Sequence, residues 1–226
     1  QILKGTEPDV YLVLDEDFNT LASLGALKNL DMLVGGDKEF DFNVFYSSVY
    51  KAGQYEGSQY ALPMECNPTL MFVNKTLLQK EGIKVPDNDW TWDDFYDICK
   101  TIVKDSDGDG QMDQFGCYDY TWLQAVYSNG ITPFNQSGTS SNFLDEKFSQ
   151  SLEFVKRLEA TNRNYQVTSN DFDLGKVAFR PFTFSDYRTY MPYPWRIKKY
   201  SGFEWTCIRM PAGPSGDNRS EMSALL

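Results

Sequence analysis

The chain has 226 residues, of which 41% are hydrophobic and 15% aromatic, and its formal net charge at pH 7 is -11. A surface this acidic repels phosphate backbones and anionic lipid, which argues against nucleic-acid binding and against a membrane-surface role. The sequence contains no histidine, which excludes His-based acid–base catalysis, Ser-His-Asp hydrolysis and His-ligated zinc. No apolar run approaches the ~20 residues that a membrane span requires.

The first predicted elements are a short strand and a helix. The apolar run over residues 9–14 predicts a buried strand, and residues 18–24 predict a helix. Between them stand Asp15, Glu16 and Asp17. A strand that delivers carboxylates to a helix start is the usual arrangement of an α/β binding crevice. Acidic residues also favour a helix N-terminus because of its dipole, so both interpretations stay open for Asp15 and Glu16.

The rest of the chain alternates predicted strands with predicted helices. Strands are predicted over residues 57–62, 68–73, 115–118, 177–179 and 206–210. Helices are predicted over residues 74–81, 91–104, 122–127 and 145–159, and loops over residues 130–142 and 211–218. The clearest helix start is Thr91, which forms a capping-box-like pair with Asp94. Strands that alternate with helices predict the α/β class.

Two groups of side chains are predicted to be buried. The last long helix presents an apolar side made of Phe148, Leu152, Phe154, Val155 and Leu158. The four cysteines are Cys66, Cys99, Cys117 and Cys207. They contain no Cys-x-x-Cys pair, so zinc and thioredoxin-like redox sites are not expected. They allow three full disulfide pairings, among which the sequence does not choose, but the wide spacing favours mostly free, buried thiols.

Residues 105–113 form the most specific local motif, with carboxylates at alternate positions and glycine at the sixth. This is the pattern of a tight oxygen cage for Ca²⁺. The ligands at positions 1, 3, 5, 7 and 9 would be Asp105, Asp107, Asp109, the Gln111 carbonyl and Asp113. Gly116 stands where an EF-hand has its final glutamate, so the cage is short of ligands. The alternative is a solvated acidic turn, but carboxylates this close repel without a cation, which favours a structural Ca²⁺.

Four segments between residues 5 and 95 match known motifs. They are Gly5-Thr6-Glu7-Pro8-Asp9-Val10-Tyr11, Gly25-Ala26-Leu27-Lys28-Asn29-Leu30, Tyr60-Ala61-Leu62-Pro63 with Met71-Phe72-Val73-Asn74-Lys75-Thr76-Leu77-Leu78, and Pro86 with Thr91-Trp92-Asp93-Asp94-Phe95. In this order they resemble the family-1 extracellular solute-binding proteins of ABC transporters, the maltose-binding-protein-like sugar-binding proteins. Two later segments, Gly175-Lys176-Val177-Ala178-Phe179 and Cys207-Ile208-Arg209-Met210-Pro211, fit strands of the same family.

The resemblance implies an α/β fold of the two-lobed periplasmic-binding-protein type II, with the ligand bound between the lobes. Residues 1–62 would be part of the N-terminal lobe, residues 63–222 most of the C-terminal lobe, and residues 223–226 the start of a strand that crosses back. The chain begins within the apparent tail of a helix and ends on an apolar run. We therefore expect an incomplete copy of this fold, and the lack of a signal peptide carries no weight.

The resemblance also implies where ligand contacts should lie. Asp15 and Glu16 follow the first strand, and Glu65 and Asn67 lie in the crossover after residue 63. Tyr120 or Trp122 follows the strand over residues 115–118, and Phe184, Asp186 and Tyr187 lie in the turn after residue 179. Acidic, amide and aromatic side chains suit the hydroxyl edges and flat CH faces of sugars. Asn67 replaces a carboxylate of maltose-binding protein, so a maltose-like pattern is not expected. A structural role is an open alternative for each residue.

The leading hypothesis is a non-catalytic carbohydrate receptor. By resemblance it would be an extracellular, lipoprotein or periplasmic monomer that closes around a carbohydrate, expected to be an oligosaccharide, and docks on ABC permease subunits. A second hypothesis is a secreted glycoside hydrolase with paired carboxylates. A third is an interaction module that depends only on Ca²⁺. The ordered motifs favour the receptor, and nothing in the sequence marks a carboxylate pair as catalytic.

Overall fold

The computed structural model describes residues 5–6, 8–135, 138–163, 165–186, 202–220 and 222–226. They divide into two compact units. Unit 1 comprises the described residues of 1–67, 136–140 and 222–226, and unit 2 comprises those of 68–135 and 141–221. The sequence predicts the change of lobe between residues 62 and 63, whereas the structure changes unit after Asn67, within a strand.

Unit 1 is built from short elements. Its helices are α1 (Asp15–Ser23), α2 (Asp31–Gly36) and α3 (Ser47–Ala52), with a 3-10 turn η2 (Phe42–Val44) and a hairpin of β1 (Gln54–Tyr55) and β2 (Ser58–Gln59). Helix α1 begins three residues earlier than predicted and ends before Gly25, whose φ is +67°. The sequence does not predict α2, η2 or α3, because elements this short show too little periodicity.

The prediction of a strand over residues 9–14 is wrong, because this segment is not a strand of either sheet. Among the described residues, Leu14 forms an isolated β-bridge and Val13 pairs with Leu226: the Val13 N–H donates to the Leu226 carbonyl at 2.7 Å, and the Leu226 N–H donates to the Val13 carbonyl at 3.0 Å. Val13 is buried, but Leu12 is 60% and Leu14 52% exposed. The apolar run is extended as expected, but the described part of the chain covers only one side of it.

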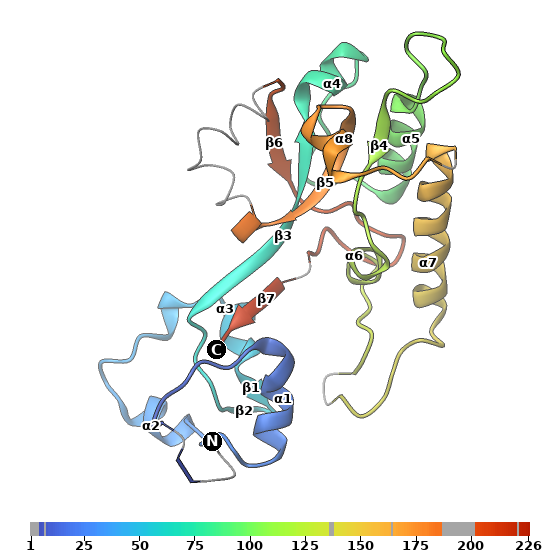
Figure 1. Cartoon of the computed structure of the whole chain (residues 1–226). Coiled ribbons are helices and arrows are strands. Elements are labelled where there is room, and N and C mark those ends of the chain that lie inside the picture. Colours follow the sequence, from blue (N-terminus) through green and yellow to red (C-terminus); the bar gives the residue numbers. More distant parts are fainter. Residues whose placement is uncertain (1–4, 7, 136–137, 164, 187–201, 221) are drawn as a thin grey trace. The chain divides into compact units, whose positions relative to one another are not determined.

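A mixed sheet forms the centre of unit 2 (Figure 1). Its strands are β3 (Glu65–Asn74), β4 (Phe115–Cys117), β5 (Val177–Thr183) and β6 (Trp205–Ile208), in the order β4-β5-β3-β6. Strand β4 runs parallel to β5, and β3 is antiparallel to β5 and β6. Strand β7 (Met222–Leu225), which belongs to unit 1, also pairs with β3.

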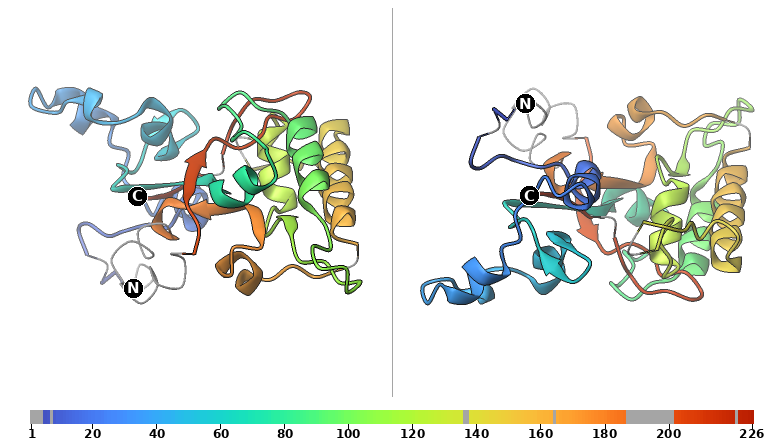
Figure 2. Two further views of the ribbon diagram at one scale, coloured as in Figure 1. Left: turned by 90° about the horizontal axis from the view of Figure 1, so that it is seen from above. Right: turned by 90° about the horizontal axis from the view of Figure 1, so that it is seen from below.

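Helices pack on both faces of this sheet. They are α4 (Lys75–Lys80), α5 (Trp92–Ile102), α6 (Trp122–Ser128), α7 (Glu146–Glu159) and α8 (Ser169–Asp173), with a 3-10 turn η3 (Ala160–Asn162) after α7. Met71 of β3 lies in the cluster formed with α5 and α7, while its neighbour Phe72 lies in the cluster with Phe172 of α8. Because successive strand residues face opposite ways, α8 covers the face opposite α5 and α7. Figure 2 shows α5, α6 and α7 grouped together.

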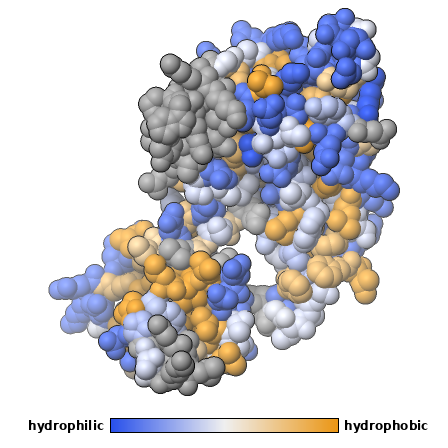
Figure 3. All heavy atoms as spheres, in the orientation of Figure 1, coloured by the Kyte–Doolittle hydropathy of each residue, from blue (hydrophilic) through white to orange (hydrophobic). Residues whose placement is uncertain are grey.

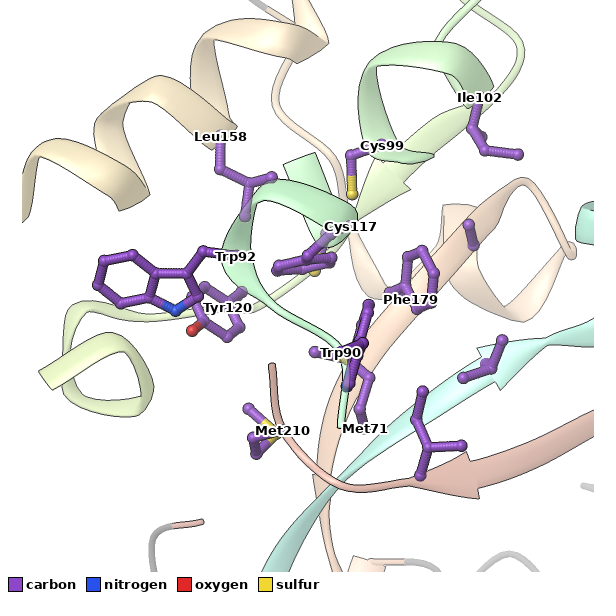
Figure 4. Packing of buried hydrophobic residues seen from close by; sticks show 14 of the residues in the cluster. Met71, Trp90, Trp92, Cys99, Ile102, Cys117, Tyr120, Leu158, Phe179 and Met210 are labelled. Atoms are coloured by element: carbon purple, nitrogen blue, oxygen red, sulfur yellow. The ribbon is translucent and has the colours of Figure 1, made fainter. Parts of the chain in front are cut away.

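The main core of unit 2 is rich in aromatic rings (Figure 4). Phe95 is fully buried and makes ring contacts with Trp90, Tyr120 and Phe179 at centroid distances of 5.1–5.4 Å. The predicted capping box of α5 is confirmed, because the Thr91 N–H donates to Asp94 Oδ2 at 2.8 Å and the Asp94 N–H donates to Thr91 Oγ1 at 3.3 Å.

One predicted core position is wrong. Leu152 of α7 is 45% exposed, and Ser151 is fully buried instead. The Ser151 hydroxyl donates to the Lys147 carbonyl at 2.7 Å, which satisfies it inside the helix packing. The four cysteines are free thiols, with Cys99 and Cys117 buried. Among the described helices, none combines the length and the apolar character that crossing a membrane requires.

Candidate functional site

Strands β4 and β5 of unit 2 run in the same direction, and β4 ends beside the middle of the longer strand β5. The two strands are parallel, with Cys117 opposite Phe179. The chain leaves β4 through Tyr118, whose N–H donates to the Phe179 carbonyl at 3.0 Å. Ligands of open α/β sheets bind beyond the carboxyl ends of parallel strands. The carboxyl end of β4 is therefore the part of unit 2 that its topology favours for a ligand.

Asp119, two residues after β4, has a backbone conformation that is unusual for its type. Its φ is +65°, and its side chain is exposed. Aspartate adopts this left-handed region more readily than most residues, but the conformation is still rare outside glycine. Such backbone strain collects at ligand sites, where surrounding structure holds a side chain in place.

Arg180 of β5 lies in a cage of aromatic rings on the α8 side of the sheet. Its guanidinium carbon is 3.9 Å from the centroid of Phe182, 4.9 Å from Tyr118 and 5.3 Å from Phe172. Its Nε and Nη1 are buried and have no hydrogen-bond partner among the described residues. An unpaired buried donor costs about 1–3 kcal/mol, which cation–π contacts offset in part.

Arg180 is not among the residues predicted from the sequence. The available signal was a single arginine within the otherwise apolar run Val177-Ala178-Phe179-Arg180-Pro181-Phe182. A charged residue in a central strand is rarely buried unless it is paired, so it merits a functional interpretation.

The structure separates the two aromatic candidates that follow β4. Tyr120 is 6% exposed and lies in the main core, where its hydroxyl is 3.4 Å from Ser128 Oγ and burial raises its pKa. Tyr120 nevertheless lines the pocket described below, so its role in ligand binding stays a prediction. Trp122, the first residue of α6, is 43% exposed. Of the pair, Trp122 is the ring that reaches the surface.

Trp122 lines a pocket of about 740 Å³ that lies wholly within unit 2. The walls come from the loop between β4 and α6, the C-terminal half of α7 with η3, and residues 165–167. Tyr118 and Asp119 also line it, so the pocket begins at the carboxyl end of β4. Its volume is within the range of about 300–1,000 Å³ that is usual for small-molecule sites.

The residues predicted after β5 lie at the end of that strand. Phe184 is 43% exposed. Asp186 Oδ2 accepts a hydrogen bond from Thr183 Oγ1 at 2.7 Å, and the Asp186 N–H donates to the same hydroxyl at 3.3 Å. Asp186 therefore caps the turn that follows β5. Tyr187, the third predicted residue, lies outside the described residues.

The remaining predicted ligand residues belong to unit 1. Asp15 is the first residue of α1, and Glu16 follows it with an exposed side chain. Glu65 is exposed at the start of β3, and Asn67 is half-buried in the same strand. Their role in ligand binding stays a prediction.

The acidic loop between α5 and β4 folds into a tight series of turns. Carboxylate oxygens of Asp105, Asp107 and Asp109 all lie within 4.8 Å of one another. The N–H groups of Gly108 and Gly110 donate to the two Asp105 oxygens at 2.6 and 2.7 Å, and these bonds lower the pKa of Asp105. Ionised carboxylate oxygens are the ligands that Ca²⁺ prefers, so these three residues fit the ion.

The last two predicted ligands of this loop are placed differently. Asp113 Oδ2 accepts from the Ser106 N–H at 2.9 Å. Gln111 donates its backbone N–H to Asp109 Oδ1 at 2.8 Å. The structure therefore brings together the side chains of three of the five predicted ligands, Asp105, Asp107 and Asp109, and the roles of the Gln111 carbonyl and of Asp113 stay predictions.

The family of the chain follows from its sequence as a whole. Residues 1–216 match the family model for "Bacterial extracellular solute-binding protein". The chain belongs to this family. The resemblance found in the sequence motifs is thereby confirmed.

Solved structures of family-like proteins share the fold. The ABC substrate-binding protein Lmo0181 from Listeria monocytogenes, in complex with cycloalternan, matches with a TM-score of 0.69 at 21% identity and covers 100% of this chain and 57% of its own. The sugar-binding protein MalE from Xanthomonas citri matches with a TM-score of 0.74 at 18% identity, over 99% of this chain and 58% of its own. The cyclic α-maltosyl-1,6-maltose binding protein from Arthrobacter globiformis matches with a TM-score of 0.75 at 16% identity, over 99% of this chain and 56% of its own.

These matches confirm the predicted α/β fold of two-lobed binding proteins. The chain spans a little under three fifths of the length of these solved proteins. The ligand of this solute-binding protein is therefore proposed below.

Proposed function

We propose that this solute-binding protein is the substrate-binding component of an ABC importer and that it binds an oligosaccharide. The observation that carries the proposal is the family match over residues 1–216. One structure of the same fold is a complex with cycloalternan and another is named a cyclic α-maltosyl-1,6-maltose binding protein, and both ligands are oligosaccharides. The glycoside hydrolase alternative has no comparable support.

The chemistry at the carboxyl ends of β4 and β5 agrees with this ligand class. Exposed aromatic rings at Trp122 and Phe184 offer flat apolar faces, while Asp119 offers an exposed acceptor. A sugar needs this combination of stacking faces and hydrogen-bonding groups. Unit 2 would contribute ligand contacts of this kind, and Asp15, Glu16, Glu65 and Asn67 would be the contacts contributed by unit 1.

The proposal extends to partners and location. The protein would act as a monomer without catalytic activity, at the cell surface as a lipoprotein or in the periplasm, and deliver its ligand to the permease subunits. The closure of two lobes around a ligand is the general mechanism of such binding proteins.

The test is a thermal-shift and calorimetry screen of the chain against mono- and oligosaccharides. A ligand at 100 times its Kd adds about 2.7 kcal/mol of stability, which is easily seen as a raised Tm. Chromatography of the sugars after incubation separates receptor from hydrolase. Recovery of intact sugar with a raised Tm supports the proposal, and release of shorter sugars would contradict it.

We further propose that the loop over residues 105–113 binds Ca²⁺ through Asp105, Asp107 and Asp109. The support is the convergence of their carboxylate oxygens within 4.8 Å. Ca²⁺ should raise the Tm of the wild-type chain, and a chelator should reverse the effect. Asp107→Asn should abolish the shift, while Asp89→Asn, an exposed acid elsewhere on unit 2, should keep it. Equal shifts in both variants would contradict the site.

A further inference from the structure

The pocket beside α7 contains a tyrosine ring that is both exposed and held in position. Tyr165 is 44% exposed and lines the pocket. Its ring stacks on Phe115 at a centroid distance of 4.5 Å and an interplanar angle of 16°. Its hydroxyl donates to Asp171 Oδ1 at 3.3 Å. A ring fixed by stacking and by a hydrogen bond loses little entropy when a ligand packs on it.

A second exposed ring lines the same pocket from another segment. Trp122 packs against Phe148 at 5.8 Å with an interplanar angle of 51°, and 43% of it is exposed. Tyr165 comes from the loop after η3, whereas Trp122 begins α6. Each ring packs one side on a buried ring, Tyr165 on Phe115 and Trp122 on Phe148, and leaves more than two fifths of its residue surface exposed.

The pocket also contains an acceptor without a donor. Asn162 of η3 lines it, and its Oδ1 is buried with no hydrogen-bond partner among the described residues. A buried acceptor left unpaired is costly, so a hydroxyl that reached it from the pocket would stabilise the bound state. Exposed Asp119 and Glu159 add carboxylates and exposed Lys156 adds a cation to the lining. Apolar faces with hydroxyl-binding groups match a sugar ring.

We infer that this pocket of unit 2 binds one pyranose residue of the ligand, packed against both Tyr165 and Trp122, with a sugar hydroxyl donating to Asn162 Oδ1. The inference rests on the proposed function for the class of ligand. It adds residues of η3, of α7 and of the following loop, which the motif analysis does not assign to any site. It places a saccharide contact within unit 2 itself, whatever unit 1 contributes.

Two variants test the pocket without removing the stacked pair of Tyr165 and Phe115. Ala160→Trp adds bulk at an exposed position of the lining, and Trp122→Ala removes one exposed ring. Phe134→Ala is the matched control, because Phe134 is a 53% exposed ring of unit 2 that does not line this pocket. Circular dichroism and Tm of each variant verify that it is folded.

The measurement is isothermal titration calorimetry of the whole chain with short α- and β-linked glucose and mannose oligosaccharides. Ala160→Trp and Trp122→Ala should each weaken binding of the best sugar by roughly tenfold, and Phe134→Ala should change it by less than twofold. If wild type binds a sugar and both pocket variants bind it equally well, the pocket inference is overturned while the proposed function stands. If the wild type binds no saccharide, both are overturned.

Discussion

The two units bury their apolar side chains to very different extents. In unit 2, buried residues from four strands and several helices form one large cluster. The corresponding cluster of unit 1 consists of Val13, Phe18, Ala22, Ala61, Ala224 and Leu226. Meanwhile Val10, Met32 and Tyr46 of unit 1 are 87%, 88% and 83% exposed. Apolar residues are visible on the surface of unit 1 in Figure 3.

This difference shows that apolar content alone does not decide stability. Burial of apolar surface supplies about 25 cal/mol per Å², so apolar side chains that stay in water contribute nothing. Unit 1 is held by a few contacts around Phe18 and by single backbone pairs such as Val13 with Leu226. We therefore expect unit 1 to open at a lower free energy than unit 2, which amide hydrogen exchange measures directly.

The largest expected effect comes from a cavity in the core of unit 2. Phe95→Ala removes a ring with 0% exposure and should lower the free energy of unfolding by about 3–5 kcal/mol. Urea unfolding followed by tryptophan fluorescence measures it, since Trp90, Trp92, Trp122 and Trp205 all belong to unit 2.

Phe18→Ala is the matched change in unit 1, because Phe18 is 2% exposed. It should leave the midpoint of the tryptophan transition close to that of wild type while hydrogen exchange of α1 increases. Equal displacement of the transition by both variants would show that the units unfold together and would overturn the comparison.

A glycine-to-alanine change should have opposite signs in the two units. A Cβ on Gly116 of β4 would lie 2.4 Å from Cys99 Cβ, so Gly116→Ala should cost about 1–3 kcal/mol through overpacking. A Cβ on Gly35 of α2 meets nothing within 4 Å. Gly35→Ala should therefore stabilise α2 by about 0.5–1 kcal/mol. Hydrogen exchange of α2 and urea unfolding of unit 2 report the two effects separately, and the same sign for both would contradict the burial difference.

Helix capping offers a smaller effect in each unit. Thr91→Ala breaks the capping box of α5 and should cost about 1 kcal/mol. Helix α1 has Leu14 at its N-cap, with no side-chain hydrogen bond, and Leu14 is 52% exposed. Leu14→Asn should therefore slow hydrogen exchange in α1. Faster exchange would mean that the Leu14 side chain, although half exposed, stabilises unit 1 more than a cap would.

The elements that could be predicted from sequence are those whose local signals agree with their packing. The capping box at Thr91 and the apolar face of α5 point to the same helix, and the structure has it. Long α7 was predictable because fourteen residues carry a clear period. Leu152 was misassigned there because a helical face is continuous in sequence, whereas burial depends on which neighbour lies above it.

The candidate site was less predictable for the same physical reason. Motif position indicated the loop after β4 but could not tell buried Tyr120 from exposed Trp122 two residues later. The sequence did not reveal three residues of the site, Arg180, Asn162 and Tyr165. Each stands out only through a contact with a residue far away in sequence or through a buried polar atom that has no partner among the described residues. Periodicity and short motifs carry no such information.

The smallest expected effect is a pH dependence confined to unit 2. The Glu81 side chain is 10% exposed and pairs with Lys104, whose hydrogen bond lowers the pKa of Glu81. A carboxyl with a lower pKa in the folded state stabilises it fully above its unfolded pKa of about 4.3, and this stability is lost as the pH falls through the folded value. Unit 2 should therefore weaken on acidification below about pH 4.3.

Glu81→Gln tests this contribution, because glutamine keeps the shape and removes the charge. The variant should be less stable than wild type at pH 7, and the gap should narrow as the pH falls into the acidic range. Lys84, whose exposed amine pairs with Asp87 at 3.3 Å, supplies the control Lys84→Gln, which should change stability little at any pH because exposed ion pairs contribute about 0–1 kcal/mol. A gap for Glu81→Gln that stays constant with pH would mean that the side chain stabilises unit 2 through packing and its hydrogen bond with Gln114, independently of its charge.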